Sequence, residues 1–296
     1  MTFDRLPLSR RRFIGTVAGT LLAGAGTANA AGDPRVATLD WAILETLLAI
    51  GANVMAATEL LQFRNVAVTP AVPPSVVDLG LRGTPNFEML LYARPDLIFN
   101  SNFYDWADDR LRLIAPVESH AIYRSGESPY ALSEAMTVAI GARLGLATGQ
   151  TFVDTCREKL AAYRTVFAKS DGRPVLPINL GDSRHFRVFG SDSMFGEVLT
   201  RVGLQNAWKS LTSYSATAPV NIETLATVPE AWIVLIPPHP PEAFAELQRS
   251  AFWQALPAVR AGRVMRLGSI DPYGALPAAL RFAKLLVEGF QHARNG

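Results

Sequence analysis

Two short patterns of apolar and polar positions recur in the same order along the chain. The first, Glu-x-Leu-x-x-x-Gly, closes an apolar stretch with helical spacing at residues 45–51 and again at 197–203. Glycine is the expected stop of such a helix. The second pattern runs from an Asn through a proline to an apolar run, at residues 86–99 and again at 221–236. Each of its copies predicts a short helix, a proline break and a buried strand. Two patterns repeated in one order predict two related α/β lobes.

A long helical segment separates the two copies. It begins at Thr148 or Thr151 and ends before Asp171-Gly172. About twenty residues at 1.5 Å each span roughly 30 Å, the width of a domain. Because a helix is stiffer than a Gly/Ser linker, we expect the two lobes to close only slightly on each other, with the ligand in a cleft between them. One face of the segment is apolar and comprises Phe152, Cys156, Leu160, Tyr163 and Phe167. The predicted organisation is an N-terminal α/β lobe at 31–144, a connecting helix at 145–169 and a C-terminal α/β lobe at 170–296.

Residues 1–30 have the pattern of an export signal. Three arginines, Arg10 to Arg12, precede a mild apolar run, and Ala28-Asn29-Ala30 matches the small-residue cleavage pattern. The apolar run is too short to span a bilayer. The arginines favour the twin-arginine route, which predicts a periplasmic protein beginning near Ala31. The alternative is an N-terminal anchor helix that is not cleaved.

Composition narrows the classes of function. Removing residues 1–30 takes away four arginines and one acid, which lowers the formal net charge from +2 to −1. A chain with a net charge so close to zero has no general attraction to the phosphate backbone of nucleic acid, so no nucleic-acid partner is expected. The single cysteine, Cys156, excludes an intrachain disulfide and is expected to be a small buried hydrophobe. Metal sites need several ligands in concert, and no such spacing is found for His120, His185, His239 and His292.

Several stretches resemble a known family. Residues 77–90 and 95–98 resemble the helical-backbone class of periplasmic binding proteins, and more closely its ferric-hydroxamate (ferrichrome-type) siderophore-binding members. Shorter matching stretches lie at 114–116, 182–190, 206–208, 256–263 and 273–275. The resemblance covers nearly the whole mature chain. It implies a monomer without catalytic activity that delivers an iron(III)–siderophore to an inner-membrane ABC permease. Iron arrives inside its chelator, so no cofactor and no protein ligand to the metal are expected.

The same resemblance assigns ligand-binding residues. It implies that Arg82 contacts the iron-bound hydroxamate oxygens and that Tyr104, Tyr214 and Tyr273 lie in the cleft. An arginine presents a permanently charged, planar donor fork to anionic oxygens, and tyrosines pack the organic part of the ligand while offering a polar tip.

The chain also departs from the ferrichrome binders, and the departures predict a more polar cleft. Val66, Asn100 and Asp271 stand where these proteins tend to carry Trp, and Arg187 stands where an apolar residue is usual. Asn100, Asp271 and Arg187 are therefore included among the expected ligand contacts. Asp271 favours a siderophore with a free amine, whereas Arg187 favours an anionic chelator; the sequence leaves both open.

Two acids are candidates for docking to the permease. Binding proteins of this class dock through one acidic residue on each lobe. The repeated pattern suggests Glu223, just after the Tyr214 loop, and Asp109, after the Tyr104 loop, with Asp108 beside it as a substitute. The alternative is that these acids stabilise the N-termini of helices.

Other interpretations of the chain remain open. Heme, cobalamin or a catechol siderophore are alternative ligands, because related binding proteins take them. Gly181-Asp182-Ser183 with His185 resembles the nucleophile block of a hydrolase, and the competing interpretation is a turn between two strands. For Phe103 and Trp106 the alternative to ligand contact is a buried aromatic cluster, and Trp41 is expected in the core.

Overall fold

The first half of the chain forms a parallel sheet. The computed structural model describes residues 33–212 and 217–295. Five strands lie in the order β3-β2-β1-β4-β5, and all are parallel. They are β1 (Arg35–Thr38), β2 (Asn53–Ala57), β3 (Val77–Asp78), β4 (Leu97–Asn100) and β5 (Val117–Ser119). The connecting helices are α1 (Trp41–Ala49), α2 (Leu60–Val66), α3 (Phe87–Ala93), η1 (Asn102–Ala107) and α4 (Asp108–Arg112).

The second half forms a mixed sheet in the order β10-β9-β6-β7-β8. Strands β10, β9 and β6 are parallel, whereas β7 and β8 are antiparallel to their neighbours. The strands are β6 (Val175–Leu180), β7 (His185–Val188), β8 (Thr217–Asn221), β9 (Trp232–Leu235) and β10 (Val264–Arg266). The helices are α7 (Met194–Arg201), η2 (Ile222–Thr227), α8 (Pro241–Arg249), α9 (Ala251–Ala255) and α10 (Pro257–Arg260).

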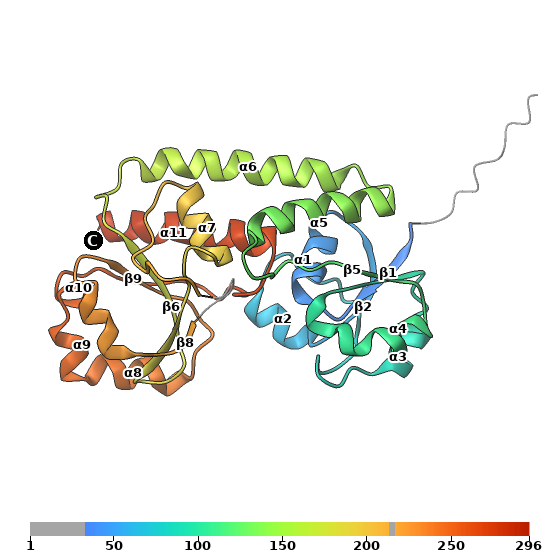
Figure 1. The fold of residues 1–296 in the computed structure, drawn as a ribbon, viewed down its shortest axis with the longest axis horizontal. Helices are drawn as coiled ribbons and strands as arrows, with labels where there is room; N and C mark the ends of the chain where they lie inside the picture. The colour runs from blue at the N-terminus through green and yellow to red at the C-terminus, as the bar shows by residue number, and fades with distance from the viewer. Residues whose placement is uncertain (1–32, 213–216, 296) are drawn as a thin grey trace, which may run out of the picture. The chain divides into compact units, whose positions relative to one another are not determined.

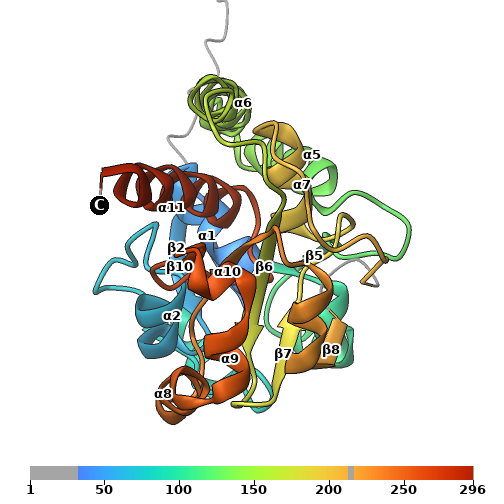
Figure 2. The same ribbon diagram turned by 90° about the vertical axis from the view of Figure 1, so that its left-hand side faces the viewer.

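Three long helices lie along one side of the two sheets (Figure 1). They are α5 (Pro129–Leu144), α6 (Thr148–Phe167) and α11 (Leu276–Asn295). Figure 2 views α6 nearly end-on, with α11 and α7 below it, and α6 contacts both. Helix α6 falls within the segment expected to connect the lobes and begins at the first of the two expected threonines. The chain therefore has the two-lobed α/β architecture predicted from its sequence.

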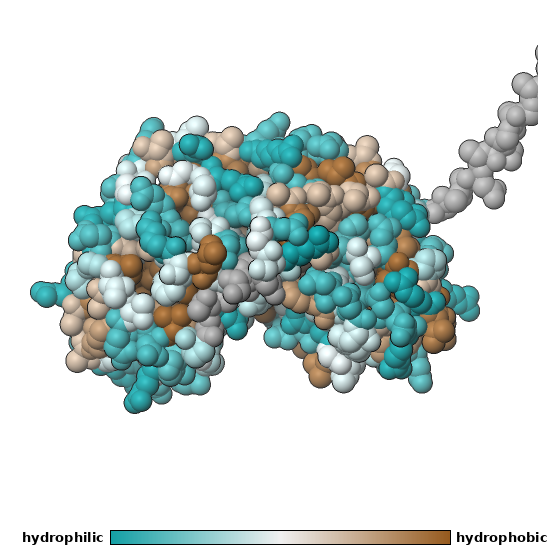
Figure 3. Space-filling model, in the orientation of Figure 1, coloured by the Kyte–Doolittle hydropathy of each residue, from teal (hydrophilic) through white to brown (hydrophobic). Residues whose placement is uncertain are grey.

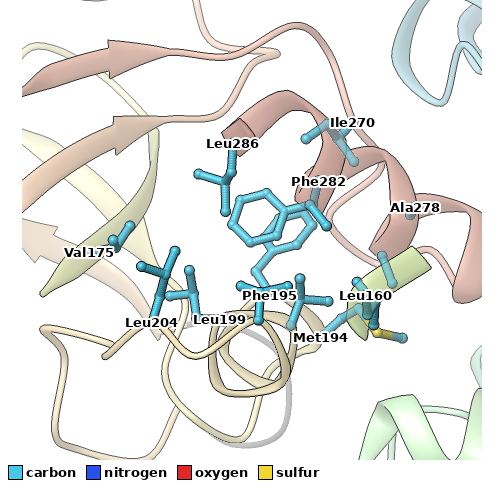
Figure 4. Packing of buried hydrophobic residues seen from close by; sticks show 14 of the residues in the cluster. Leu160, Val175, Met194, Phe195, Leu199, Leu204, Ile270, Ala278, Phe282 and Leu286 are labelled. Carbon is cyan, nitrogen blue, oxygen red and sulfur yellow. The ribbon is translucent and has the colours of Figure 1, made fainter. Parts of the chain in front are cut away.

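The apolar stripe of α6 packs into the core of the second half. Cys156 and Leu160 are fully or almost fully buried there among residues of α7 and α11. Burial raises the pKa of the Cys156 thiol to about 12, so this side chain acts as a small hydrophobe, as predicted. Figure 4 shows the adjoining contact between α7 and α11, where the rings of Phe195 and Phe282 lie 4.4 Å apart.

Both repeated patterns form the predicted elements. The Glu-x-Leu pattern ends α1 before Gly51 and α7 before Gly203, and these glycines have φ of 78° and 82°, which side chains with a Cβ disfavour. The second pattern forms α3 followed by β4, and η2 followed by β9. Its later copy is a 3-10 helix rather than an α-helix. The expected strand turn also forms, because Gly181-Asp182-Ser183 joins antiparallel strands β6 and β7.

Candidate functional site

A pocket lies where three loops of the first sheet meet a segment from the end of the chain. The loops follow β1, β3 and β4, so they gather at the carboxyl edge of the parallel sheet, where α/β proteins bind ligands. The cavity has a volume of about 200 Å³ and is lined by Asp40, Trp41, Ala42, Arg82, Phe103, Tyr104, Asp271 and Tyr273. The surface is also hollowed between the two halves of the chain, on the side away from α6 (Figure 3).

Arg82 is held in place by Glu59. The Glu59 carboxylate accepts hydrogen bonds from Arg82 Nε at 2.8 Å and from the Arg82 backbone N–H at 2.9 Å. The guanidinium carbon lies 4.2 Å from the ring centre of Trp41, a cation–π distance. Glu59 has a left-handed φ of 51°, which is uncommon for a residue with a Cβ. Its side chain makes no capping hydrogen bond to the start of α2 and binds Arg82 instead.

Tyr104 lies beside Arg82 in the pocket wall, within reach of its guanidinium, and keeps its proton at neutral pH. Burial raises the pKa of its hydroxyl to about 12, so it remains able to donate a hydrogen bond. Beneath it, the amide of Asn100 donates to the Tyr104 carbonyl at 3.1 Å and to Asp108 Oδ1 at 2.7 Å. Asn100 is itself completely buried. It does not line the pocket, unlike the ligand contact expected from the sequence, and supports the Tyr104 loop instead.

Asp40 is an acid of the pocket that the sequence did not single out. Its carboxylate caps α1 by accepting the N–H groups of Ala42 and Ile43, at 2.7 and 3.1 Å, and accepts the Ser101 hydroxyl at 2.6 Å. Burial raises its pKa. An N-cap acid directly after a strand is a recognisable signal, which marks this loop as part of the carboxyl edge.

Asp271 and Tyr273 reach the pocket from the far end of the sequence. Asp271 is 5% exposed, and burial raises its pKa to about 6. The resemblance assigned both residues to the cleft, but as parts of the C-terminal half. The structure packs their segment against the core of the first half, where Tyr273 and Ala275 belong to one hydrophobic cluster with residues of α1 and α2.

The other predicted site residues lie at varying distances from this pocket. Arg187 on β7 places its guanidinium carbon 5.8 Å from the ring centre of Tyr273, so it borders the pocket from the second half. Val66 is buried in the core, and Tyr214 falls outside the described residues. Asp109 and Glu223 are exposed in the first turns of α4 and η2.

The aromatic residues depart in part from the sequence expectations. Phe103 and Trp106 are 42% and 55% exposed, so the alternative of a buried cluster for these two is wrong. The ring of Phe103 lies next to that of Tyr123, with the ring centres 6.1 Å apart. Trp41 is buried as expected, yet it also forms a wall of the pocket beneath Arg82.

Three further observations concern metal sites, other pockets and membrane spans. In the described parts, 33–212 and 217–295, no group of three or more His, Cys, Asp or Glu side chains is arranged to hold a metal ion. A second pocket of about 250 Å³ lies between the ends of α6 and α11, and its described lining contains no arginine or tyrosine. None of the helices that the structure describes is long and apolar enough to cross a membrane.

Comparison with known proteins identifies the family. The iron(3+)-hydroxamate-binding protein FhuD of Escherichia coli K12 is 32% identical over 286 residues, which cover 95% of this chain and 96% of that protein. The structure of Fe³⁺–Desferal-bound FhuD from Vibrio cholerae matches with a TM-score of 0.82 at 23% identity, over 87% of this chain and 98% of that one. Staphylococcus aureus SirA, complexed with staphyloferrin B, matches with a TM-score of 0.65 at 19% identity, over 88% and 94%. The two structural matches show a shared fold. A family model described as periplasmic binding protein matches residues 36–270, and the chain therefore belongs to the periplasmic binding protein family.

Proposed function

We propose that this protein is the periplasmic solute-binding component of an ABC importer for iron(III)–siderophores of the hydroxamate type. The observation that carries the proposal is the pocket that Arg82 and Tyr104 line together with aromatic side chains. The 32% identity to an iron(3+)-hydroxamate-binding protein over nearly the whole chain supports the same ligand class.

The pocket chemistry fits a ferric hydroxamate. The oxygens around the iron carry negative charge, and the guanidinium N–H groups of Arg82 left free by Glu59 are suited to them. The protonated Tyr104 hydroxyl adds a second donor. Trp41, Phe103 and Tyr273 supply apolar surface for the organic backbone of the chelator. The iron enters as part of the ligand, so the protein needs no metal-binding residue of its own.

Binding without catalysis is part of the proposal. The Gly181-Asp182-Ser183 segment is a turn between β6 and β7, and His185 Nδ1 lies 3.0 Å from Asp182 Oδ2. A carboxylate beside the histidine does not by itself make a triad, because the serine must be the group that the histidine deprotonates. An esterase assay on the purified protein is expected to give no turnover that depends on Ser183.

The proposed setting is the periplasm, reached by the twin-arginine route, with an inner-membrane ABC permease as partner. Asp109 and Glu223 are exposed and make no hydrogen bond or ion pair among the described residues. They therefore remain candidates for docking. Asp108 is a weaker candidate, because its carboxylate already bonds Asn100 and, at 2.9 Å, Arg112. We propose that the binding protein acts as a monomer.

A tryptophan-fluorescence titration tests the function. Trp41 lines the pocket, so a ferric complex bound there is expected to quench its emission. The panel should contain ferric hydroxamates, a ferric catecholate, heme and cobalamin. We expect saturable quenching by hydroxamates at micromolar concentration. Trp41→Phe should reduce the amplitude of quenching, whereas Trp253→Phe, in the core of the second sheet, should not. Absence of quenching by every ferric siderophore would overturn the proposal.

A further inference from the structure

Most of the charge in the pocket is already matched within the protein. Arg82 is paired with Glu59, whose side chain is only 12% exposed. Asp40 accepts three hydrogen bonds, two from the start of α1 and one from Ser101. A charged group in a desolvated site needs such partners, because burial without them costs free energy. The Arg82–Glu59 pair and the Asp40 carboxylate therefore have their charges matched without a ligand.

The Asp271 carboxylate, unlike those of Glu59 and Asp40, is only partly matched by partners within the protein. It is 95% buried, and one carboxylate oxygen accepts the backbone N–H of Tyr273 at 3.1 Å. The other oxygen has no hydrogen-bond donor and no ion-pair partner within the part of the chain that the structure describes. Yet Asp271 lines the pocket, so this oxygen is placed where a ligand can reach it.

We propose that Asp271 forms a subsite for a cationic group, an ammonium, carried by the iron chelate that occupies the pocket. The proposal rests on the proposed function and deepens it by naming a charge on the ligand. Arg82 acts on the charge of Asp271 but forms its ion pair with Glu59, so an ammonium would be the direct partner of the Asp271 carboxylate. A charge-assisted hydrogen bond in a desolvated site is among the stronger polar contacts.

The charged neighbours of Asp271 leave the pocket wall negative. Glu45 lies behind it, and burial together with the charge of Asp271 raises the Glu45 pKa well above its ordinary value. Even with Glu45 protonated, three acids face two arginines. Besides the tyrosines Tyr104, Tyr123 and Tyr273, the charged groups around the pocket are Asp40, Glu59, Asp271, Arg82 and Arg187. A cation on the ligand therefore improves the match of charge at this wall.

Protonated Asp271 could instead donate a hydrogen bond to a neutral ligand, and the pH dependence of affinity distinguishes this role from an ammonium subsite. Burial raises its pKa to about 6, so near pH 5 it is mostly protonated and able to donate a hydrogen bond to a neutral ligand. An ammonium subsite requires the ionised form, so affinity for an amine-bearing ligand should rise as pH increases from 5 to 7.5. A donor role predicts a fall in affinity over the same interval.

A matched pair of ligands tests the proposal. The probes are the Fe³⁺ complex of Desferal, a linear hydroxamate that ends in a primary amine, and the same complex acetylated on that amine. Affinities are measured by calorimetry at pH 5 and 7.5 for the parent, Asp271→Asn and the remote control Asp154→Asn, an exposed position on α6. We expect the parent and the control to prefer the amine complex by about tenfold at pH 7.5. The preference should shrink at pH 5 and disappear in Asp271→Asn.

Three results would overturn the subsite. They are equal affinity of the parent for the two complexes at pH 7.5, a preference that survives in Asp271→Asn, and binding of both complexes that strengthens as pH falls. The parent's pH profile provides the test even where the variant does not fold. If the parent binds neither complex nor any other ferric siderophore of the panel, it is the proposed function that fails.

Discussion

The carboxylate of Glu45 on α1 accepts the backbone N–H of Ala278 on α11 at 3.3 Å, across 233 residues of sequence. The same carboxylate also accepts the N–H of Ala275. Nearby, the Tyr123 hydroxyl donates to the Gly274 carbonyl at 2.7 Å. A Cβ on Gly274 would lie 2.7 Å from a Glu45 oxygen, so only glycine permits this approach. These contacts attach the segment that carries Asp271 and Tyr273 to the first half.

Replacing Glu45 with Ala should destabilise the protein. The change leaves two N–H groups at the start of α11 without their acceptor in a fully buried place. We expect a loss of about 2–4 kcal/mol in the free energy of unfolding, measured by urea denaturation. Glu158→Ala, at an exposed position of α6, is the control and should change little. A Glu45→Ala protein as stable as the parent would contradict this account of the α11 anchor.

Removing the Arg82 guanidinium should weaken siderophore binding. Loss of a charge-assisted contact in a desolvated pocket is worth roughly 1.5–3 kcal/mol, or about ten- to a hundredfold in affinity. Arg82→Ala is compared with the parent by calorimetry. Arg64→Ala, at an exposed position of α2, serves as the matched control and should bind like the parent. Equal affinity for Arg82→Ala would remove this residue from the site.

Glu59 should matter for binding through Arg82 alone. Glu59→Gln keeps an oxygen acceptor but loses the charge that holds the guanidinium, so we expect a loss of affinity of about three- to tenfold. In an Arg82→Ala background the same change should have almost no further effect, because the partner that it positions is gone. A full, additive effect in the double variant would show that Glu59 acts on the ligand by another path.

Asp271→Asn should stabilise the empty protein at neutral pH. The folded pKa of Asp271, about 6, lies above its ordinary value of 3.8, so the folded state holds this proton more tightly than the unfolded chain. The stability that this binding contributes is present below about pH 4 and is lost as pH rises to 6. Asn avoids the loss, which predicts a gain of ~1–3 kcal/mol at pH 7.5 relative to pH 4.5. Urea denaturation at both values checks this, and a pH-independent difference from the parent would contradict it.

Charge reversal at the two docking candidates separates docking from helix stabilisation. The double variant Asp109→Lys, Glu223→Lys should abolish siderophore uptake by cells while siderophore affinity and thermal stability stay near those of the parent. Exposed charges steer association more than they hold a fold. If the acids serve their helix termini instead, stability should fall and uptake should follow only the loss of folded protein. A variant that folds, binds and supports normal uptake would end the docking assignment.

The sequence by itself determined the architecture, because local patterns report local burial. Helical spacing with Cys156 and Leu160 on one face placed α6, and the repeated patterns placed α1, α7 and the strands β4 and β9 within each half. These features depend on neighbours three or four positions away along the chain. The family resemblance added Arg82, Tyr104 and Tyr273, which the structure brings into one pocket.

Tertiary structure alone decided which side chains share that pocket. Nothing local distinguishes Asn100, which is buried beneath the Tyr104 loop, from the exposed Phe103 three residues later. The order of strands brings the loops after β1, β2, β3 and β4 to one edge. This places Asp40 and Trp41 in the pocket wall and Glu59 against Arg82. The place of Asp271 depends on hydrogen bonds from α11 to Glu45, more than two hundred residues away. Periodicity along a chain cannot encode such a contact, because it is set by how whole elements pack.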